Sequence, residues 1–130
     1  MTQAKVKYIV DTQIFLWWLS DDGRLSSKAR TIISSEENTL FFSAASVWEI
    51  SIKSSLGKLP KVKNLCQLVM EEGFQHLPIT AEQAEGVSEL SNYHKDPFDR
   101  LLLAQSRMLK FSFLTSDKIL ARYGKFVVVV

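Results

Sequence analysis

The segment Lys7-Tyr8-Ile9-Val10-Asp11-Thr12 is an apolar run that ends at a single carboxylate. Its length and its β-branched and aromatic residues predict a strand, and the segment TQIFLWWL (12–19) that follows has helical spacing. Four further runs of strand length follow along the chain: TLFFSA (39–44), HLPIT (76–80), FSFLTSD (111–117) and KFVVVV (125–130). Because helix-like segments separate these runs, the sequence predicts an α/β fold with a central parallel sheet and helices on its faces.

The size and composition of the chain indicate one domain. Its 130 residues are 46% hydrophobic and 23% charged, with a formal net charge of +2. A single domain spanning 1–130 is therefore expected, with a charge too small to indicate nucleic-acid binding by itself. Apolar runs stay well short of the roughly 18 to 20 residues of a membrane span, and Cys66 is the one cysteine. We expect a cytoplasmic protein without membrane contact, disulfide or thiolate zinc site.

Two helix starts are visible in the sequence. Thr80 and Gln83 have the spacing of a capping box, and Asp96 followed by Pro97 has the order of an N-cap and a first-turn proline. The sequence therefore predicts helices that begin after Thr80 and after Asp96.

Four acids stand alone in apolar surroundings. Asp11 is the one charged residue between Tyr8 and Ser20, and Glu49 the one between Leu40 and Ile52. In the same way, Asp99 precedes LLLAQS (101–106) and Asp117 ends FSFLTS (111–116). Burial of an ionised carboxylate costs several kcal/mol unless it meets a cation, so this placement favours the edge of the fold or a metal.

The predicted topology brings these acids toward one another. Asp11 and Asp117 follow predicted parallel strands, and ligands of open parallel sheets bind outside the carboxyl ends of the strands. Carboxylates that converge there repel by roughly 4 kcal/mol per pair at about 4 Å, and a divalent cation offsets this cost. Oxygen donors without a Cys or His cluster indicate Mg²⁺ or Mn²⁺, the usual cations for displacement at phosphate.

Each acid also has an ordinary structural interpretation. Asp96 and Asp99 suit the first turn of a helix, and Asp11 and Asp117 could equally be helix caps. Glu49 could form a surface ion pair with Lys53, one turn further on. The lysine cluster in which Lys53 occurs is either a solvated face or a guide for an acidic polymer, and comprises Lys53, Lys58, Lys61 and Lys63. His76 and His94 are isolated in the sequence, which favours structural roles for both.

Five motifs occur in a characteristic order over nearly the whole chain. They are YIVDTQIFLWWL (8–19), FFSAASVWEISIKSSLGKL (41–59), LPITAEQA (77–84), HKDPFDRLLLAQ (94–105) and FLTSDKILARYG (113–124). This combination resembles the PIN-domain family, and within it the VapC-like toxins of type II toxin–antitoxin pairs. The resemblance implies a three-layer α/β/α sandwich acting as a Mg²⁺- or Mn²⁺-dependent endoribonuclease. It also implies an RNA substrate such as tRNA or rRNA, a small antitoxin partner and a homodimer.

The resemblance assigns roles to the acids residue by residue. Asp11, Glu49, Asp99 and Asp117 match the family's catalytic acids, and we expect Asp11 and Asp99 to hold the metal most directly. Four neighbouring residues are expected in supporting positions around these ligands: Thr12, Ser43, Asp96 and Thr115. Close relatives commonly have His where this chain has Gln13, which leaves the acids intact but alters the contacts available to substrate or antitoxin.

Three alternatives stay open. The chain could be a PIN nuclease of general RNA processing without a toxin role, or a catalytically silent PIN-like module that binds a partner. A phosphoacceptor receiver domain shares the alternating strand–helix order, although receivers normally carry paired acids after the first strand and this chain has one.

Overall fold

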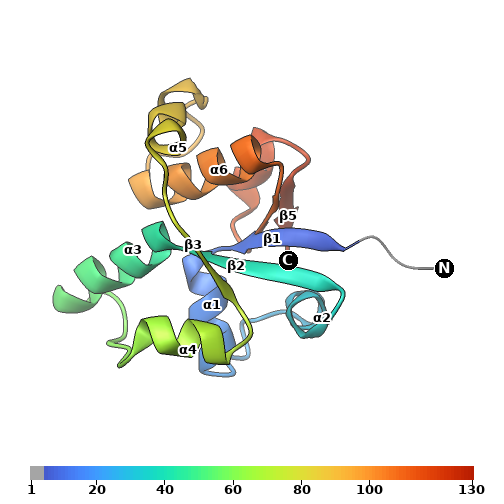
Figure 1. Cartoon of the computed structure of the whole chain (residues 1–130), viewed down its shortest axis with the longest axis vertical. Helices are drawn as coiled ribbons and strands as arrows, with labels where there is room; N and C mark the ends of the chain where they lie inside the picture. Colours follow the sequence, from blue (N-terminus) through green and yellow to red (C-terminus); the bar gives the residue numbers. More distant parts are fainter. Residues whose placement is uncertain (1–4) are drawn as a thin grey trace.

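All five apolar runs contribute a strand to one parallel sheet, although the run 76–80 does so only through its first two residues (Figure 1). The strands are β1 (Val6–Val10), β2 (Asn38–Ser43), β3 (Gln75–Leu77), β4 (Ser112–Thr115) and β5 (Val127–Val129). The computed structural model describes residues 5–130, so residues 1–4 of the expected domain lie outside the described part. The predicted parallel sheet is confirmed.

The strands lie in the order β3-β2-β1-β4-β5, and every pairing is parallel. The chain first adds β2 and β3 on one side of β1 and then crosses to add β4 and β5 on the other. The strand order therefore reverses between β1 and β4, the position at which open parallel sheets bind ligands. Receiver domains of the CheY type have the order 2-1-3-4-5, so the receiver alternative is wrong.

The alternation of side chains along the strands gives the sheet two apolar faces. One face presents Tyr8, Val10, Leu40, Phe42 and Leu114. The opposite face presents Ile9, Phe113 and Val127. Both sets are buried, so the helices form a layer on each side.

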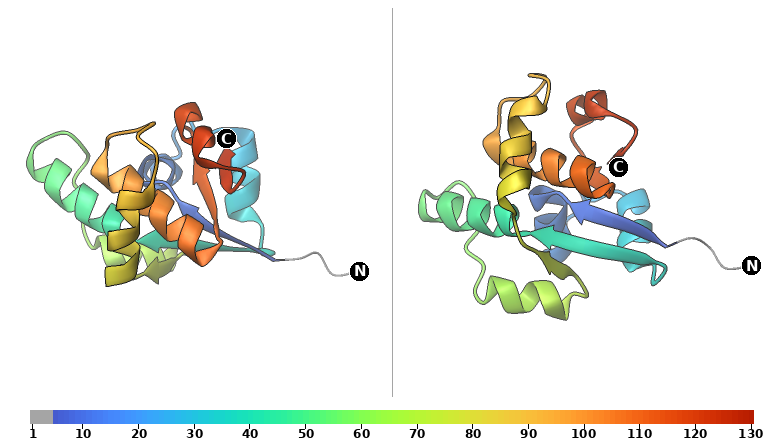
Figure 2. Two further views of the ribbon diagram at one scale, coloured as in Figure 1. Left: turned by 90° about the horizontal axis from the view of Figure 1, so that it is seen from above. Right: turned by 45° about the horizontal axis from the view of Figure 1, so that its top comes forward.

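Six α-helices and two short 3₁₀ helices of the described residues build the outer layers (Figures 1 and 2). The first layer contains α1 (Thr12–Leu19), α2 (Ser27–Ser34) and α4 (Leu65–Glu71). The second contains α5 (Ala81–Gly86), η1 (Val87–Glu89), α6 (Pro97–Leu109) and η2 (Lys118–Tyr123). The helix α3 (Ala44–Ser55) continues from β2 and contributes to both apolar clusters. The three-layer α/β/α sandwich is confirmed, and no helix within residues 5–130 is long and apolar enough to span a membrane.

Both predicted helix starts are present. Thr80 Oγ1 accepts a hydrogen bond from Gln83 N, and Gln83 Oε1 accepts one from Thr80 N, each at 3.1 Å. At α6, Asp96 Oδ1 accepts from the backbone N–H of Phe98 at 2.9 Å and of Asp99 at 3.0 Å. The cap fixes the first turn of α6, and with it the direction of Asp99.

Gln105 organises the polar interior of the second layer. Its side chain is completely buried, and Oε1 accepts a hydrogen bond of 2.5 Å from Ser43 Oγ. Its Nε2 donates to Gln83 Oε1 at 3.0 Å and to Pro78 O at 3.2 Å. One amide thereby joins the end of β2 to α5 and to the segment that precedes it.

We expect Gln105→Leu to lower the free energy of unfolding by about 2–4 kcal/mol, because buried groups on Ser43, Gln83 and Pro78 lose their partner. Urea unfolding measures the change. Gln67→Leu is the control, since Gln67 is exposed on α4 and should change stability by less than about 0.5 kcal/mol. Equal stability of the two variants would contradict the prediction.

Candidate active site

A cavity of about 220 Å³ lies at the carboxyl edge of the sheet, beside the ends of β1 and β4. Carboxylates from four segments line it: Asp11, Glu49, Asp96, Asp99 and Asp117. The remaining lining residues are Thr12, Gln13, Lys53, Leu59 and Ser116. The structure thus places all four acids of the sequence prediction, and Asp96, around one space.

Asp11 lies at the base of this cavity, 8% exposed. Its backbone N donates to Leu114 O at 2.9 Å, which holds the residue against β4, and Thr115 Oγ1 donates to its Oδ2 at 2.6 Å. Although Asp11 is the N-cap residue of α1, its side chain lacks the geometry of the caps that Asp96 and Asp117 form, so capping alone does not account for this buried acid. Burial, followed by repulsion from Asp99 and Glu49, raises the pKa of Asp11 to about 7.

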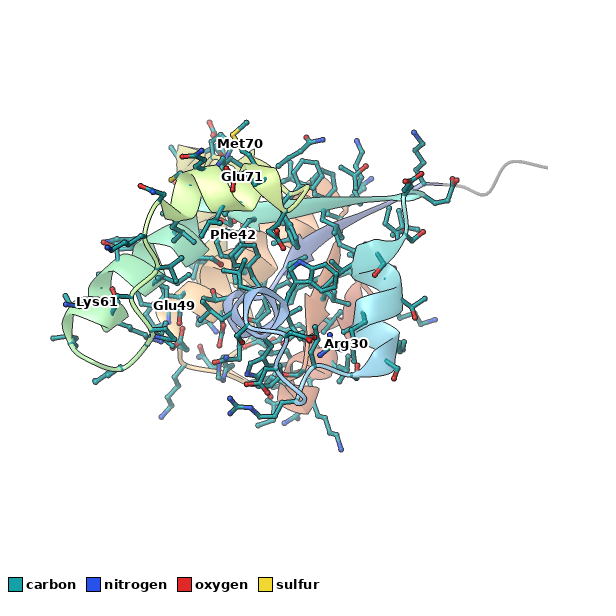
Figure 3. The ribbon with its side chains drawn as sticks, turned by 90° about the horizontal axis from the view of Figure 1, so that it is seen from below. Arg30, Phe42, Glu49, Lys61, Met70 and Glu71 are labelled. Carbon is teal, nitrogen blue, oxygen red and sulfur yellow. The ribbon has the colours of Figure 1, made fainter. Side chains whose placement is uncertain are left out.

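Glu49 projects from α3 (Figure 3). Its side chain is buried, with the residue 7% exposed. Its Oε2 accepts a hydrogen bond of 2.5 Å from Lys53 Nζ, whereas its Oε1 is buried without a hydrogen-bond partner. The pair with Lys53 therefore exists as anticipated, but it lines the cavity and is not a solvated surface pair. A buried carboxylate oxygen without a donor is costly, which marks this position for a cationic ligand.

Asp96 and Asp99 make different contacts at the start of α6. Asp96 caps the helix through Oδ1, while its Oδ2 lies 3.7 Å from Lys53 Nζ. Asp99 forms a hydrogen bond of 2.7 Å through Oδ2 with His94 Nε2. Burial raises the pKa of Asp99, and the hydrogen bond with His94 partly opposes that rise. His94 thus keeps the structural role expected of it, and its ring in addition holds a carboxylate that lines the cavity.

Asp117 is connected to Asp11 through one hydroxyl group. Its backbone N donates to Thr115 Oγ1 at 3.1 Å, and the same hydroxyl donates to Asp11. The side chain of Asp117 accepts from Ile119 N at 3.1 Å, which caps η2. Asp117 thus combines the predicted cap with a place in the cavity wall, as Asp96 does.

Thr12 and Ser43 do not make the expected hydrogen bonds to the acids. Thr12 Oγ1 donates to Ser46 Oγ at 2.7 Å, which ties α1 to α3. Ser43 caps α3 by accepting from Ala45 N at 3.0 Å, and it donates to Gln105. Both hydroxyls are already engaged in helix placement, and of the two residues Thr12 lines the cavity whereas Ser43 does not.

The donors around the cavity suit a hard divalent cation. No three His, Cys, Asp or Glu side chains among residues 5–130 are already arranged to hold a metal ion. The residues nevertheless provide carboxylate oxygens from four segments, one of them unpartnered on Glu49, and an Asp11 whose ionised form is disfavoured first by burial and then by Asp99 and Glu49. Bound Mg²⁺ or Mn²⁺ would give the Glu49 oxygen a partner and would stabilise the ionised form of Asp11, so the donor set fits such an ion.

Three solved structures of other proteins share this fold. VapBC2 from Rickettsia felis bound to a DNA fragment from their promoter gives a TM-score of 0.66 at 13% identity, covering 96% of this chain and 98% of that chain. A toxin–antitoxin complex from Klebsiella pneumoniae gives 0.65 at 18% identity, covering 94% and 96%. PAE2754 from Pyrobaculum aerophilum gives 0.56 at 15% identity, covering 97% and 92%.

A search of the curated proteins gave no match. The sequence pattern of the PIN domain matches residues 8–126, from β1 to the residue before β5. This match takes in every acid of the cavity and four of the five strands, so the chain belongs to the PIN domain family.

Proposed function

We propose that this protein is a Mg²⁺- or Mn²⁺-dependent endoribonuclease, and that it acts as the toxin of a type II toxin–antitoxin pair. One observation carries the nuclease proposal. Acids far apart in the sequence line a single cavity at the switch point of the sheet, and one of them has a buried oxygen without a partner. Membership of the PIN domain family supports the same activity.

Asp11 and Asp99 are the proposed principal ligands, with Glu49 and Asp117 completing the negative cavity. A bound divalent cation would activate water, orient the phosphodiester and stabilise its developing charge. Thr115 orients the Asp11 carboxylate, and His94 does the same for Asp99. Lys58, Lys61 and Lys63 are all exposed on the segment after α3, next to the cavity residue Leu59, where they could attract RNA phosphates.

The toxin role rests on the relatives in fold, two of which are toxin–antitoxin complexes. An apolar groove of about 490 Å³ between α1 and α4 supports a protein partner. Leu16, Trp17, Val62 and Leu68 contribute to its lining, and Gln13 lines both this groove and the acidic cavity. A small cytoplasmic antitoxin bound there would touch the active site through Gln13, and a homodimer is the proposed assembly of the toxin itself.

Cleavage of end-labelled total tRNA and ribosomal RNA by antitoxin-free protein tests the proposal. We expect cuts at discrete sites with Mg²⁺ or Mn²⁺ and none with chelator. Asp99→Asn should reduce the rate of RNA cleavage by at least about 100-fold. Loss of a residue that only positions a metal ligand costs about 10- to 100-fold, and Asp99 is proposed to hold the metal itself. Asp22→Asn is the matched control, because Asp22 pairs with Arg24 away from the cavity.

Full metal-dependent cleavage by Asp99→Asn would overturn the site assignment. A wild type that neither cleaves RNA nor shows a thermal shift with metal would favour the silent partner-binding module. Cleavage without recovery of a small partner in a pull-down from the native host would favour general RNA processing.

A further inference from the structure

Among the described residues that line the acidic cavity, one side chain is basic, that of Lys53. Its Nζ lies 2.5 Å from Glu49 Oε2 and 3.7 Å from Asp96 Oδ2. The ammonium group therefore bridges carboxylates from α3 and from the cap of α6, as a metal ion in such a cavity would.

An aromatic ring helps to fix the ammonium in this position. Lys53 Nζ lies 5.3 Å from the centroid of the Phe98 ring, within the range of a cation–π interaction. Phe98 in turn packs edge-on against Trp48, with the ring centroids 5.3 Å apart. The carboxylates of Glu49 and Asp96 and the ring of Phe98 thus fix the position of the Lys53 ammonium group.

The pair also differs from an ordinary ion pair on a helix surface. Its side chains are 28% and 9% exposed, Lys53 and Glu49 respectively, so water and salt screen the pair less than an exposed one. The ammonium satisfies one oxygen of Glu49 and leaves the other unpartnered.

Lys53 divides the cavity into two electrostatic halves. The half formed by Glu49 and Asp96 already contains a positive charge. In the described structure, no lysine or arginine forms an ion pair with Asp11, Asp99 or Asp117. This second half therefore keeps the strongest attraction for an added cation.

We propose that the Lys53 ammonium takes the place of a second divalent cation, so that the cavity accepts one Mg²⁺ or Mn²⁺ per chain, held by Asp11 and Asp99. The inference rests on the proposed metal-dependent function. Paired ions in two-metal sites lie about 3.5–4 Å apart and share the carboxylates of one cavity. A resident ammonium on Glu49 and Asp96 both uses those oxygens and repels a second divalent ion.

Mn²⁺ binding to the metal-free full chain tests the proposal, with free Mn²⁺ counted by electron paramagnetic resonance across a titration. We expect one ion per wild-type chain and two per Lys53→Gln chain. Lys53→Arg keeps the positive charge and should bind one. The charge-matched control is Lys28→Gln, at an exposed lysine of α2 outside the cavity lining, and this variant should also bind one.

The difference between Lys53→Gln and wild type tests Lys53, whereas the wild-type count tests the proposed function. A difference of one ion supports the role of Lys53 even if wild type binds none, in which case the metal-dependent function fails. Equal counts in the two proteins, including none in both, would overturn the inference about Lys53. Two ions in wild type would overturn it as well.

Thermal unfolding separates this role from a merely structural one. With chelator, Lys53→Gln should melt about 5 °C or more below wild type, because Glu49 is left without its cation. Excess Mn²⁺ should remove most of that deficit, since the second ion replaces the ammonium. A deficit that is unchanged by Mn²⁺ would show that Lys53 only supports the fold.

Discussion

Asp11→Asn is expected to make the metal-free protein more stable at pH 8 while it abolishes metal-dependent cleavage. The pKa of Asp11 in the folded protein is about 7, against an ordinary value of 3.8, because the residue is buried and lies close to Asp99 and Glu49. The folded protein therefore binds a proton at this residue over a range in which the unfolded chain has lost it.

The sign of the pH dependence follows from this difference. Stability falls as pH rises wherever the folded state holds more protons than the unfolded state, here between about pH 4 and pH 7. A difference of about three pKa units corresponds to an upper value of about 4 kcal/mol above pH 7. Asn carries no such charge and can still accept the hydrogen bond from Thr115, so the variant should gain about 2–4 kcal/mol at pH 8 and almost nothing at pH 4.

Urea unfolding with chelator at pH 4, 6 and 8 measures the effect. The control is Asp22→Asn, because Arg24 holds the pKa of Asp22 at about 2 through hydrogen bonds, and its removal should give no gain above pH 4. Mg²⁺ or Mn²⁺ should then stabilise wild type at pH 8 and leave Asp11→Asn nearly unchanged. A gain that is the same at every pH, or a loss of stability at pH 8, would contradict the assignment.

Arg100→Lys is expected to lower the free energy of unfolding by about 3–4 kcal/mol, a large effect for a substitution that keeps the charge. The Arg100 guanidinium donates to four backbone carbonyls, those of Val87, Leu90, Ser91 and His94, at 3.0–3.3 Å, and to Tyr123 Oη at 3.3 Å. These carbonyls belong to the segment that precedes α6. A lysine ammonium is a compact group and cannot reach all of these acceptors at once.

The same substitution should also reduce cleavage by about 10- to 100-fold, because the segment that Arg100 holds carries His94 and leads into Asp96. Urea unfolding and the RNA cleavage assay, at a temperature where the variant is folded, measure the two effects. Arg107→Lys is the matched control on the exposed side of α6, and it should change stability by less than about 0.5 kcal/mol. A stable and fully active Arg100→Lys protein would show that the segment is held by other contacts.

The fold was largely predictable because its signals are local. Each apolar run became a strand, and the caps at Thr80 and Asp96 form within three residues of the helices that they start. The segment 118–123 is less regular than its sequence suggests, since its six residues form the 3₁₀ helix η2. The 3₁₀ geometry is frequent in short connecting segments, such as this one between β4 and β5, although six residues is a long run for it.

The acids of the site were predictable for a related reason, because isolated carboxylates in apolar segments are visible in the sequence. Their partners were not. Thr115 meets Asp11 across the sheet, and Arg100 finds carbonyl groups 6 to 13 residues away in a segment without regular pattern. His94 gave only a faint signal, its position five residues before Asp99. These contacts form only when distant segments pack together, and neither the composition nor the periodicity of the sequence reveals that packing.

The contact between Asp11 and Thr115 joins residues 104 positions apart, through the pairing of the first strand with the fourth. A ribosome has therefore added another 104 residues after Asp11 before its carboxylate can acquire this partner, and Asp117 joins the cavity two residues later. Until that point a nascent chain has the early acids without the geometry that would allow them to act together. If the proposed activity is correct, the enzyme becomes dangerous to cellular RNA only after Thr115 and Asp117 have been translated, and an antitoxin has to be present from that moment on.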